Sequence, residues 1–103
     1  MKVYRIHPQG APLHAVKSIT SNDEVLNGVF VFESLPEAWG CREWDQRTRK
    51  VELAEIICKP SDLRQVGDYE GVLLLARRGR IVKRWPFATQ RRCTEWIAAQ
   101  VGA

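Results

Sequence analysis

The sequence predicts a single α+β domain over residues 1–103, with a mainly antiparallel sheet of four to six strands and two principal helices packed on it. Three observations lead to this prediction. Short β-branched and aromatic runs recur between turn residues. Two segments combine an N-cap residue with apolar residues at helical spacing. The chain has 103 residues, 45% hydrophobic and 27% charged, which suits one globular core.

The first strand is expected over residues 2–7, where apolar and polar residues alternate. Tyr4 and Ile6 fall on one face, and Arg5 and His7 fall on the other. Pro8 then ends the strand.

The next segment, 13–20, fits either a strand or a helical turn. Ser21 and Glu24 match a capping box, which predicts a short helix to Leu26. Residues 29–32, Val-Phe-Val-Phe, predict a strand because β-branched and aromatic side chains suit a sheet.

A second capping box starts at Ser34, with Pro36 in the first helical turn. The helix that follows is expected to carry the apolar residues Ala38, Trp39, Cys41 and Trp44. Residues 51–58 favour a strand that stops before Pro60. One helical turn is expected over 61–66.

Residues 71–87 predict a hairpin around which the sheet is organised. Its first arm, 72–76, is the longest apolar run and suits a strand buried on both faces. A tight turn at 77–80 leads to an outer strand, 81–85, in which apolar and cationic residues alternate.

The terminal helix should begin after Thr89, which is expected as its N-cap, and end at Gly102. Its apolar stripe is expected to consist of Cys93, Trp96, Ile97 and Val101.

The net charge of +4 is unevenly distributed. Residues 1–70 hold 9 Lys and Arg against 11 Asp and Glu, a net charge of −2. Residues 71–103 hold 7 basic residues against Glu95 alone, a net charge of +6. This asymmetry favours either an anionic partner for the C-terminal third, such as nucleic acid or an acidic protein, or a contact between the acidic part of one protomer and the basic part of another.

The candidate binding residues are the cations of the hairpin and the next helix start, together with one neighbouring aromatic side chain. They are Arg77, Arg78, Arg80, Lys83, Arg84, Trp85, Arg91 and Arg92. Cations neutralise phosphates, and an exposed Trp85 or Phe87 would stack on an unpaired base. The alternative is that the cations protect an outer strand from aggregation and that Trp85 belongs to the core.

An enzyme is the second hypothesis. Tyr4-Arg5 in the first strand, Phe32-Glu33-Ser34 at a strand-to-helix junction and the later Glu70 together resemble small ADP-ribosyltransferase-like domains. The resemblance implies an NAD-binding pocket in which Arg5 grips the phosphates, Ser34 braces the pocket and Glu70 orients the acceptor. Glu70 also belongs to the acidic turn 67–71, which is an acid–base candidate in its own right.

The remaining polar residues predict neither a metal site nor a cofactor. Three cysteines are widely separated and are expected as core residues of a cytoplasmic protein. His7 and His14 are too few for a metal site. No apolar stretch is long enough to cross a membrane.

We therefore expect a non-catalytic binding domain. Four tryptophans in 103 residues exceed what so small a core buries easily, so one or two are expected at an interface. A homodimer through a sheet edge or the tryptophan-bearing helices is compatible with this pattern.

Overall fold

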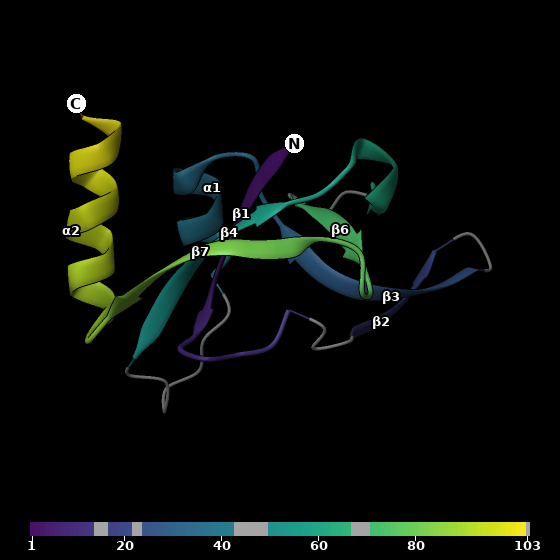
Figure 1. Ribbon diagram of the computed structural model, residues 1–103, viewed down its shortest axis with the longest axis horizontal. Coiled ribbons are helices and arrows are strands. Elements are labelled where there is room, and N and C mark those ends of the chain that lie inside the picture. Colours follow the sequence, from purple (N-terminus) through teal and green to yellow (C-terminus); the bar gives the residue numbers. More distant parts are fainter. Residues whose placement is uncertain (14–16, 22–23, 43–49, 67–70, 103) are drawn as a thin grey trace.

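The computed structural model describes residues 1–13, 17–21, 24–42, 50–66 and 71–102 (Figure 1). Within them the strands form two antiparallel sheets, one in the order β1-β4-β7 and one in the order β2-β3-β6-β5. The strands are β1 (Lys2–Pro8), β2 (Lys17–Ser21), β3 (Glu24–Val31), β4 (Val51–Ile57), β5 (Leu63–Arg64), β6 (Val72–Leu75) and β7 (Arg80–Phe87). The helices are α1 (Leu35–Gly40), the short 3₁₀ turn η1 (Pro60–Asp62) and α2 (Gln90–Val101).

The strands thus divide between two sheets, and the single sheet of four to six strands is not what the structure has. The α+β class, the antiparallel pairing and the two principal helices are confirmed. None of the described helices is long and apolar enough to cross a membrane.

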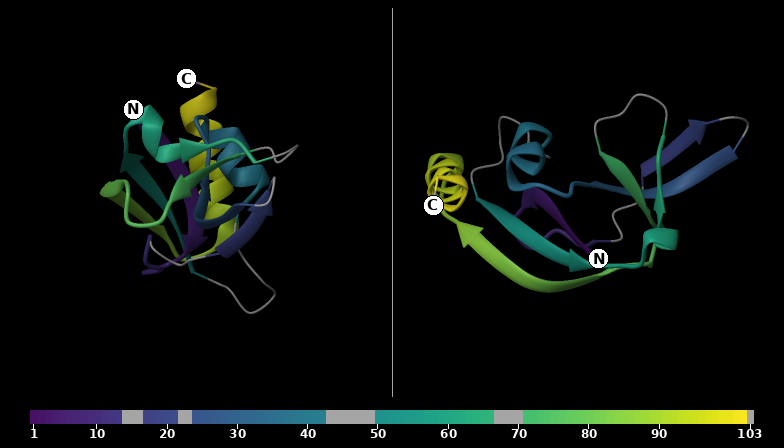
Figure 2. Two further views of the ribbon diagram at one scale, coloured as in Figure 1. Left: turned by 90° about the vertical axis from the view of Figure 1, so that its right-hand side faces the viewer. Right: turned by 90° about the horizontal axis from the view of Figure 1, so that it is seen from above.

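The three-stranded sheet is packed on both of its faces. On one face, Ile6 and Leu53 pack against Ala38 of α1 and against Cys93 and Ile97 of α2. Side chains alternate between the faces of a sheet, so the neighbouring positions point the other way. Figure 2 shows both helices on the same side of this sheet.

The opposite face of the three-stranded sheet packs against the second sheet. Val3 and Ile56 meet Val29, Val31 and Leu74 there, and all five are at most 3% exposed. Burying an aliphatic side chain of this size contributes roughly 1.5–3 kcal/mol. The predicted strand at 72–76 forms β6, which ends at Leu75 and lies between β3 and β5, with Leu73 and Leu74 buried.

The predicted hairpin at 71–87 is wrong in its pairing. β6 pairs with β3 and β5, whereas β7 pairs with β4 in the other sheet. Gly79, between them, lies where the two sheets meet: a Cβ there would lie 2.8 Å from Leu74 Cδ2 and 3.0 Å from Ile56 Cγ2. The connection therefore carries the chain from one layer to the next.

The predicted helix at 21–26 is also wrong. Ser21 and Glu24 are paired across β2 and β3, and Val25 and Leu26 continue the same ladder. Cross-strand pairing overrides the local capping signal here. The ambiguous segment 13–20 contributes the strand β2, and its residues 14–16 lie outside the described residues.

Both principal helices begin where their caps predict. The Ser34 hydroxyl accepts a hydrogen bond from Glu37 N at 3.3 Å, and the Thr89 hydroxyl accepts one from Arg92 N at 3.2 Å. α2 ends at Gly102, as expected. Val101 is 57% exposed and so does not join the buried stripe. Trp44 lies outside the described residues. In place of the helical turn at 61–66, the chain forms η1 and β5.

Candidate anion-binding surface

β7 carries most of the predicted binding residues, and it is an edge strand. It pairs with β4 alone, so its second side is open among the described residues. The register pairs Lys83 with Glu55, Arg84 with Ala54 and Trp85 with Leu53. Lys83 and Trp85 therefore lie on the helix-covered face of the sheet, and Arg84 lies on the other face.

The turn before β7 presents three exposed guanidinium groups, those of Arg77, Arg78 and Arg80, which we call the turn cations. None of them has an ion pair with a described residue. Arg77 has φ +62°, in the left-handed region that favours glycine or asparagine. An arginine at this position costs roughly 1 kcal/mol, so the charge is placed at some expense to stability.

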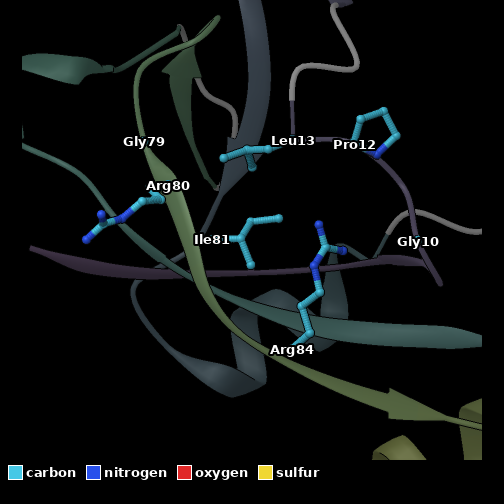
Figure 3. A pocket seen from close by; sticks show the side chains of 7 residues that line it. All are labelled: Gly10, Pro12, Leu13, Gly79, Arg80, Ile81 and Arg84. Carbon is cyan, nitrogen blue, oxygen red and sulfur yellow. The ribbon is translucent and has the colours of Figure 1, made fainter.

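Two open grooves lie on either side of Gly79. The first, of about 430 Å³, runs between Pro12 and Leu13 and the strand residues Ile81 and Arg84. In Figure 3 the Arg84 guanidinium points toward Pro12 and Gly10, whereas that of Arg80 points away. Leu13 and Ile81 form an apolar wall.

The second groove, of about 470 Å³, is lined by Lys59, Arg78, Arg80 and one carboxylate, Asp62. Asp62 Oδ2 already accepts a hydrogen bond from Lys59 N at 3.0 Å. Three cations around one engaged carboxylate leave this groove with an excess of positive charge. The grooves and the turn together form a cationic surface at the Arg80 end of β7.

From the middle of β7, Arg84 also reaches the buried carboxylate of Glu52 on β4. Its Nη1 donates to Glu52 Oε1, and the same oxygen lies 2.8 Å from His7 Nε2. His7 and Glu52 are 1% and 3% exposed, and β1 and β4 pair them directly. An ionised carboxylate only accepts hydrogen bonds, so His7 Nε2 donates and Nδ1 carries the lone pair. Nδ1 is buried and has no hydrogen-bond partner among the described residues.

Arg5 is a third buried polar residue near His7 and Glu52, whereas the Arg84 side chain that reaches them is 42% exposed. Arg5 is 7% exposed, and its Nη1 donates to the Phe30 carbonyl at 2.8 Å. Burial lowers the pKa of Arg5 to about 10. Burial likewise lowers the pKa of His7 and outweighs the hydrogen bond to Glu52, which acts in the opposite direction.

At its other end, β7 is packed into the core. Trp85 and Phe87 are half-buried against Trp96 of α2, with ring centroids 5.4 and 5.8 Å apart. The Lys83 ammonium lies 5.1 Å from the centre of the Trp85 ring. Each of the two β7 rings therefore has Trp96 against it, and all three rings remain half-buried.

Arg91 and Arg92, the helix-start cations, lie beyond this aromatic end of β7. Arg91 Nε lies 3.2 Å from Glu95 Oε1, one helical turn further on. The strand between them and the turn cations spans eight residues, or roughly 25 Å. The predicted residues therefore form two separate groups of cations.

The structure also places two of the three residues of the enzyme hypothesis. Arg5 lies on the face of the sheet that meets the second sheet, whereas Ser34 caps α1 on the helix-covered face. The third, Glu70, lies outside the described residues, with the rest of the 67–70 turn. Arg5 and Ser34 therefore lie on opposite faces of the three-stranded sheet.

The His7–Glu52 pair was not predicted as a unit. The other histidine, His14, lies outside the described residues. The available signal was Glu52 itself, a carboxylate inside the otherwise apolar run Val51–Ala54. Among the described residues, no group of three or more His, Cys, Asp or Glu side chains is placed to hold a metal.

The cysteines behave as core residues where they are buried. Cys58 and Cys93 are 6% and 0% exposed, and Cys41 is half-buried. Burial raises the pKa of Cys93 to about 11, although its helix also begins with two arginines.

Comparison with known proteins gave no match to a family model, to a curated protein or to a solved structure.

Proposed function

We propose that this chain is a non-catalytic binding domain for an anionic partner, which it contacts through the turn cations and β7. The observation that carries the proposal is the group of exposed arginines Arg77, Arg78 and Arg80, which have no ion pair with a described residue. Unpaired cations around open grooves attract anions, and the attraction is strongest at low salt.

The backbone of the turn supports the proposal. Arg77 occupies a left-handed conformation in which glycine would be less strained. Strain of this kind is found where a side chain serves a function and its surroundings hold it in place. A ligand-binding role accounts for an arginine at this position, whereas solvation of a loop needs no residue in particular.

The geometry favours contact with charge over contact with bases. Trp85 and Phe87 pack against Trp96 and are half-buried, whereas the turn cations are exposed, so the cations offer a partner more free surface than the rings do. Both an acidic protein segment and a nucleic-acid backbone meet the electrostatic requirement. The chemistry required of the partner is a row of carboxylates or phosphates.

The experiment is a salt titration with two probes, polyglutamate and a mixed-sequence oligonucleotide in single- and double-stranded form. Fluorescence anisotropy measures the dissociation constant at a series of salt concentrations. We expect the logarithm of the affinity to fall linearly with the logarithm of salt, with a slope of about −2 to −4 for three or four contacts. Absence of binding to every probe at low salt would contradict the proposal.

A further inference from the structure

We infer that β7 is a docking edge for an acidic peptide in extended conformation, which adds to the three-stranded sheet as a fourth strand. The inference rests on the proposed function and names its partner class. It differs in requiring main-chain pairing as well as opposite charge.

The first support is the open side of β7. Strand β4 pairs with β7 from Arg80 opposite Ile57 to Phe87 opposite Val51, with one register shift between Glu55 and Ile56 that leaves Val82 without a partner on β4. No backbone hydrogen bond other than those to β4 joins β7 to a described residue. An unpaired strand edge is a template for another strand, because its amide and carbonyl groups already point outward.

The second support is the length of the usable edge. Pro86 has no N–H and limits pairing at the aromatic end. Between Arg80 and Trp85 no proline interrupts the strand. This is the length of an ordinary short β-strand, enough for a peptide segment.

The third support is the placement of charge on both sides of the edge. Lys83 lies on the helix-covered face and Arg84 on the opposite face, so consecutive residues of an added strand would meet a cation on each side. Arg80 provides a further exposed cation at the turn end. The complementary segment is rich in glutamate or aspartate.

The fourth support is the groove beside the strand. It is lined by Ile81 and Arg84 from β7 and by Leu13 from the opposite wall, and has a volume of about 430 Å³. Figure 3 shows Ile81 directed toward Leu13 and the Arg84 guanidinium directed toward Pro12. In strand addition, main-chain bonds supply affinity and pockets for alternate side chains supply specificity. The groove would accept one such side chain, with its carboxylate near Arg84.

Two other occupants fit the edge less well. A second copy pairing antiparallel through β7 would set the cations of one strand against those of the other, which opposes association. A nucleic acid would satisfy the cations but leave the backbone groups of β7 without partners. The acidic peptide satisfies both.

The test compares two peptides of equal charge. One is a short peptide of alternating glutamate and valine; the other has the same sequence with N-methyl groups on alternate amides, which removes the donors along one side. Anisotropy gives the affinities, and amide hydrogen exchange reports protection of β7. We expect N-methylation to weaken binding about tenfold or more, and only the unmodified peptide to protect β7 amides.

A charge-reversal pair of variants gives a second readout. Lys83→Glu should weaken the unmodified peptide about tenfold. The control Arg64→Glu reverses one exposed cation on β5 of the other sheet and should change the affinity less than about twofold. Both side chains are exposed, and thermal unfolding of each variant checks that the fold is retained.

The outcomes separate the two proposals. Equal binding of both peptides would overturn strand addition and leave the charge-based function standing. Binding of the oligonucleotide but not of the peptide would also overturn strand addition and leave the charge-based function standing. Self-association that competes with the peptide would identify a second copy as the occupant and overturn the inference. Failure of every probe would overturn both proposals.

Discussion

The two ends of β7 are built for different tasks. At the Phe87 end, Trp85 and Phe87 pack against Trp96 and hold α2 on the sheet. At the Arg80 end, the turn cations are exposed beside two open grooves. One strand therefore serves stability through its aromatic residues and, by our proposal, recognition through its cations. Substitutions along the strand should change stability at one end and binding at the other.

The largest effect on stability is expected at the aromatic end. Trp96→Ala removes ring contacts with both Trp85 and Phe87 and should lower the free energy of unfolding by about 3 kcal/mol. Urea denaturation measures it. The control Val101→Ala, on the same helix at a 57% exposed position, should change it by less than about 0.5 kcal/mol. Equal losses would show that α2 is not held by this aromatic cluster.

The next-largest effect on stability is expected at Glu52 of β4, which accepts a hydrogen bond from Arg84 in the middle of β7. Glu52→Leu removes the acceptor of His7 Nε2–H and leaves that donor buried, at a cost of about 2 kcal/mol. Its matched control is Glu55→Leu, since Glu55 lies on the same strand but pairs with the exposed Lys2 at 3.3 Å. The control should cost less than about 1 kcal/mol. Chemical denaturation at pH 7.5 compares the two.

The His7–Glu52 pair also predicts a dependence of stability on pH. Burial lowers the pKa of His7 in the folded state, so the unfolded chain binds the proton more readily. The contribution of neutral His7 is complete above the unfolded pKa of about 6.5 and is lost progressively as pH falls below it. One proton accounts for at most about 1.4 kcal/mol per pH unit.

Denaturation between pH 7.5 and 5 should therefore show falling stability in the unaltered chain. His7→Gln keeps a donor for Glu52 but does not titrate, so the slope should be reduced. A slope that persists unchanged in His7→Gln would contradict the assignment of the effect to His7.

The smallest effect on stability is expected at the turn, where one substitution should stabilise the protein. Arg77→Gly relieves the left-handed conformation and should raise the free energy of unfolding by about 0.5 kcal/mol, while weakening the binding of an anion. Arg78→Gly removes the same charge without that relief, so it should weaken binding and slightly lower stability. Thermal unfolding and anisotropy on the same samples test both effects.

Local signals predicted several elements correctly. Alternation identified β1, and the β-branched and aromatic run at 29–32 identified the end of β3. The strand predicted at 51–58 is β4, and the hydroxyls of Ser34 and Thr89 marked the two helix starts. Each depends on residues close together in the chain. The helix predicted at 21–26 failed because Ser21 and Glu24 also suit facing positions in a hairpin, and pairing with β6 decides between the two.

The division into two sheets could not be read from the sequence. A short turn between two apolar runs ordinarily predicts a hairpin. Here Gly79 approaches Leu74 and Ile56 closely, and the chain passes between layers. The His7–Glu52 pair was hidden for the same reason, since its residues are 45 positions apart and only the register of β1 and β4 brings them together.

The candidate site was predicted in its residues but not in its arrangement. The sequence suggested one cationic face that includes Arg91 and Arg92. The structure places these helix-start cations beyond the aromatic end of β7, with Arg91 paired to Glu95. It also turns Trp85 toward Trp96, as the core interpretation expected. Charged residues that are close together in the sequence can lie on different faces or at different ends of a strand.

The most direct test of the account compares the two groups of cations at equal charge. Arg77→Gln with Arg78→Gln removes two charges at the turn, and Arg91→Gln with Arg92→Gln removes two at the helix start. Affinity for polyglutamate at low salt should fall about tenfold in the turn variant and less than about threefold in the helix variant. Equal losses, or a greater loss at the helix start, would contradict the claim that the anionic partner binds at the turn end of β7.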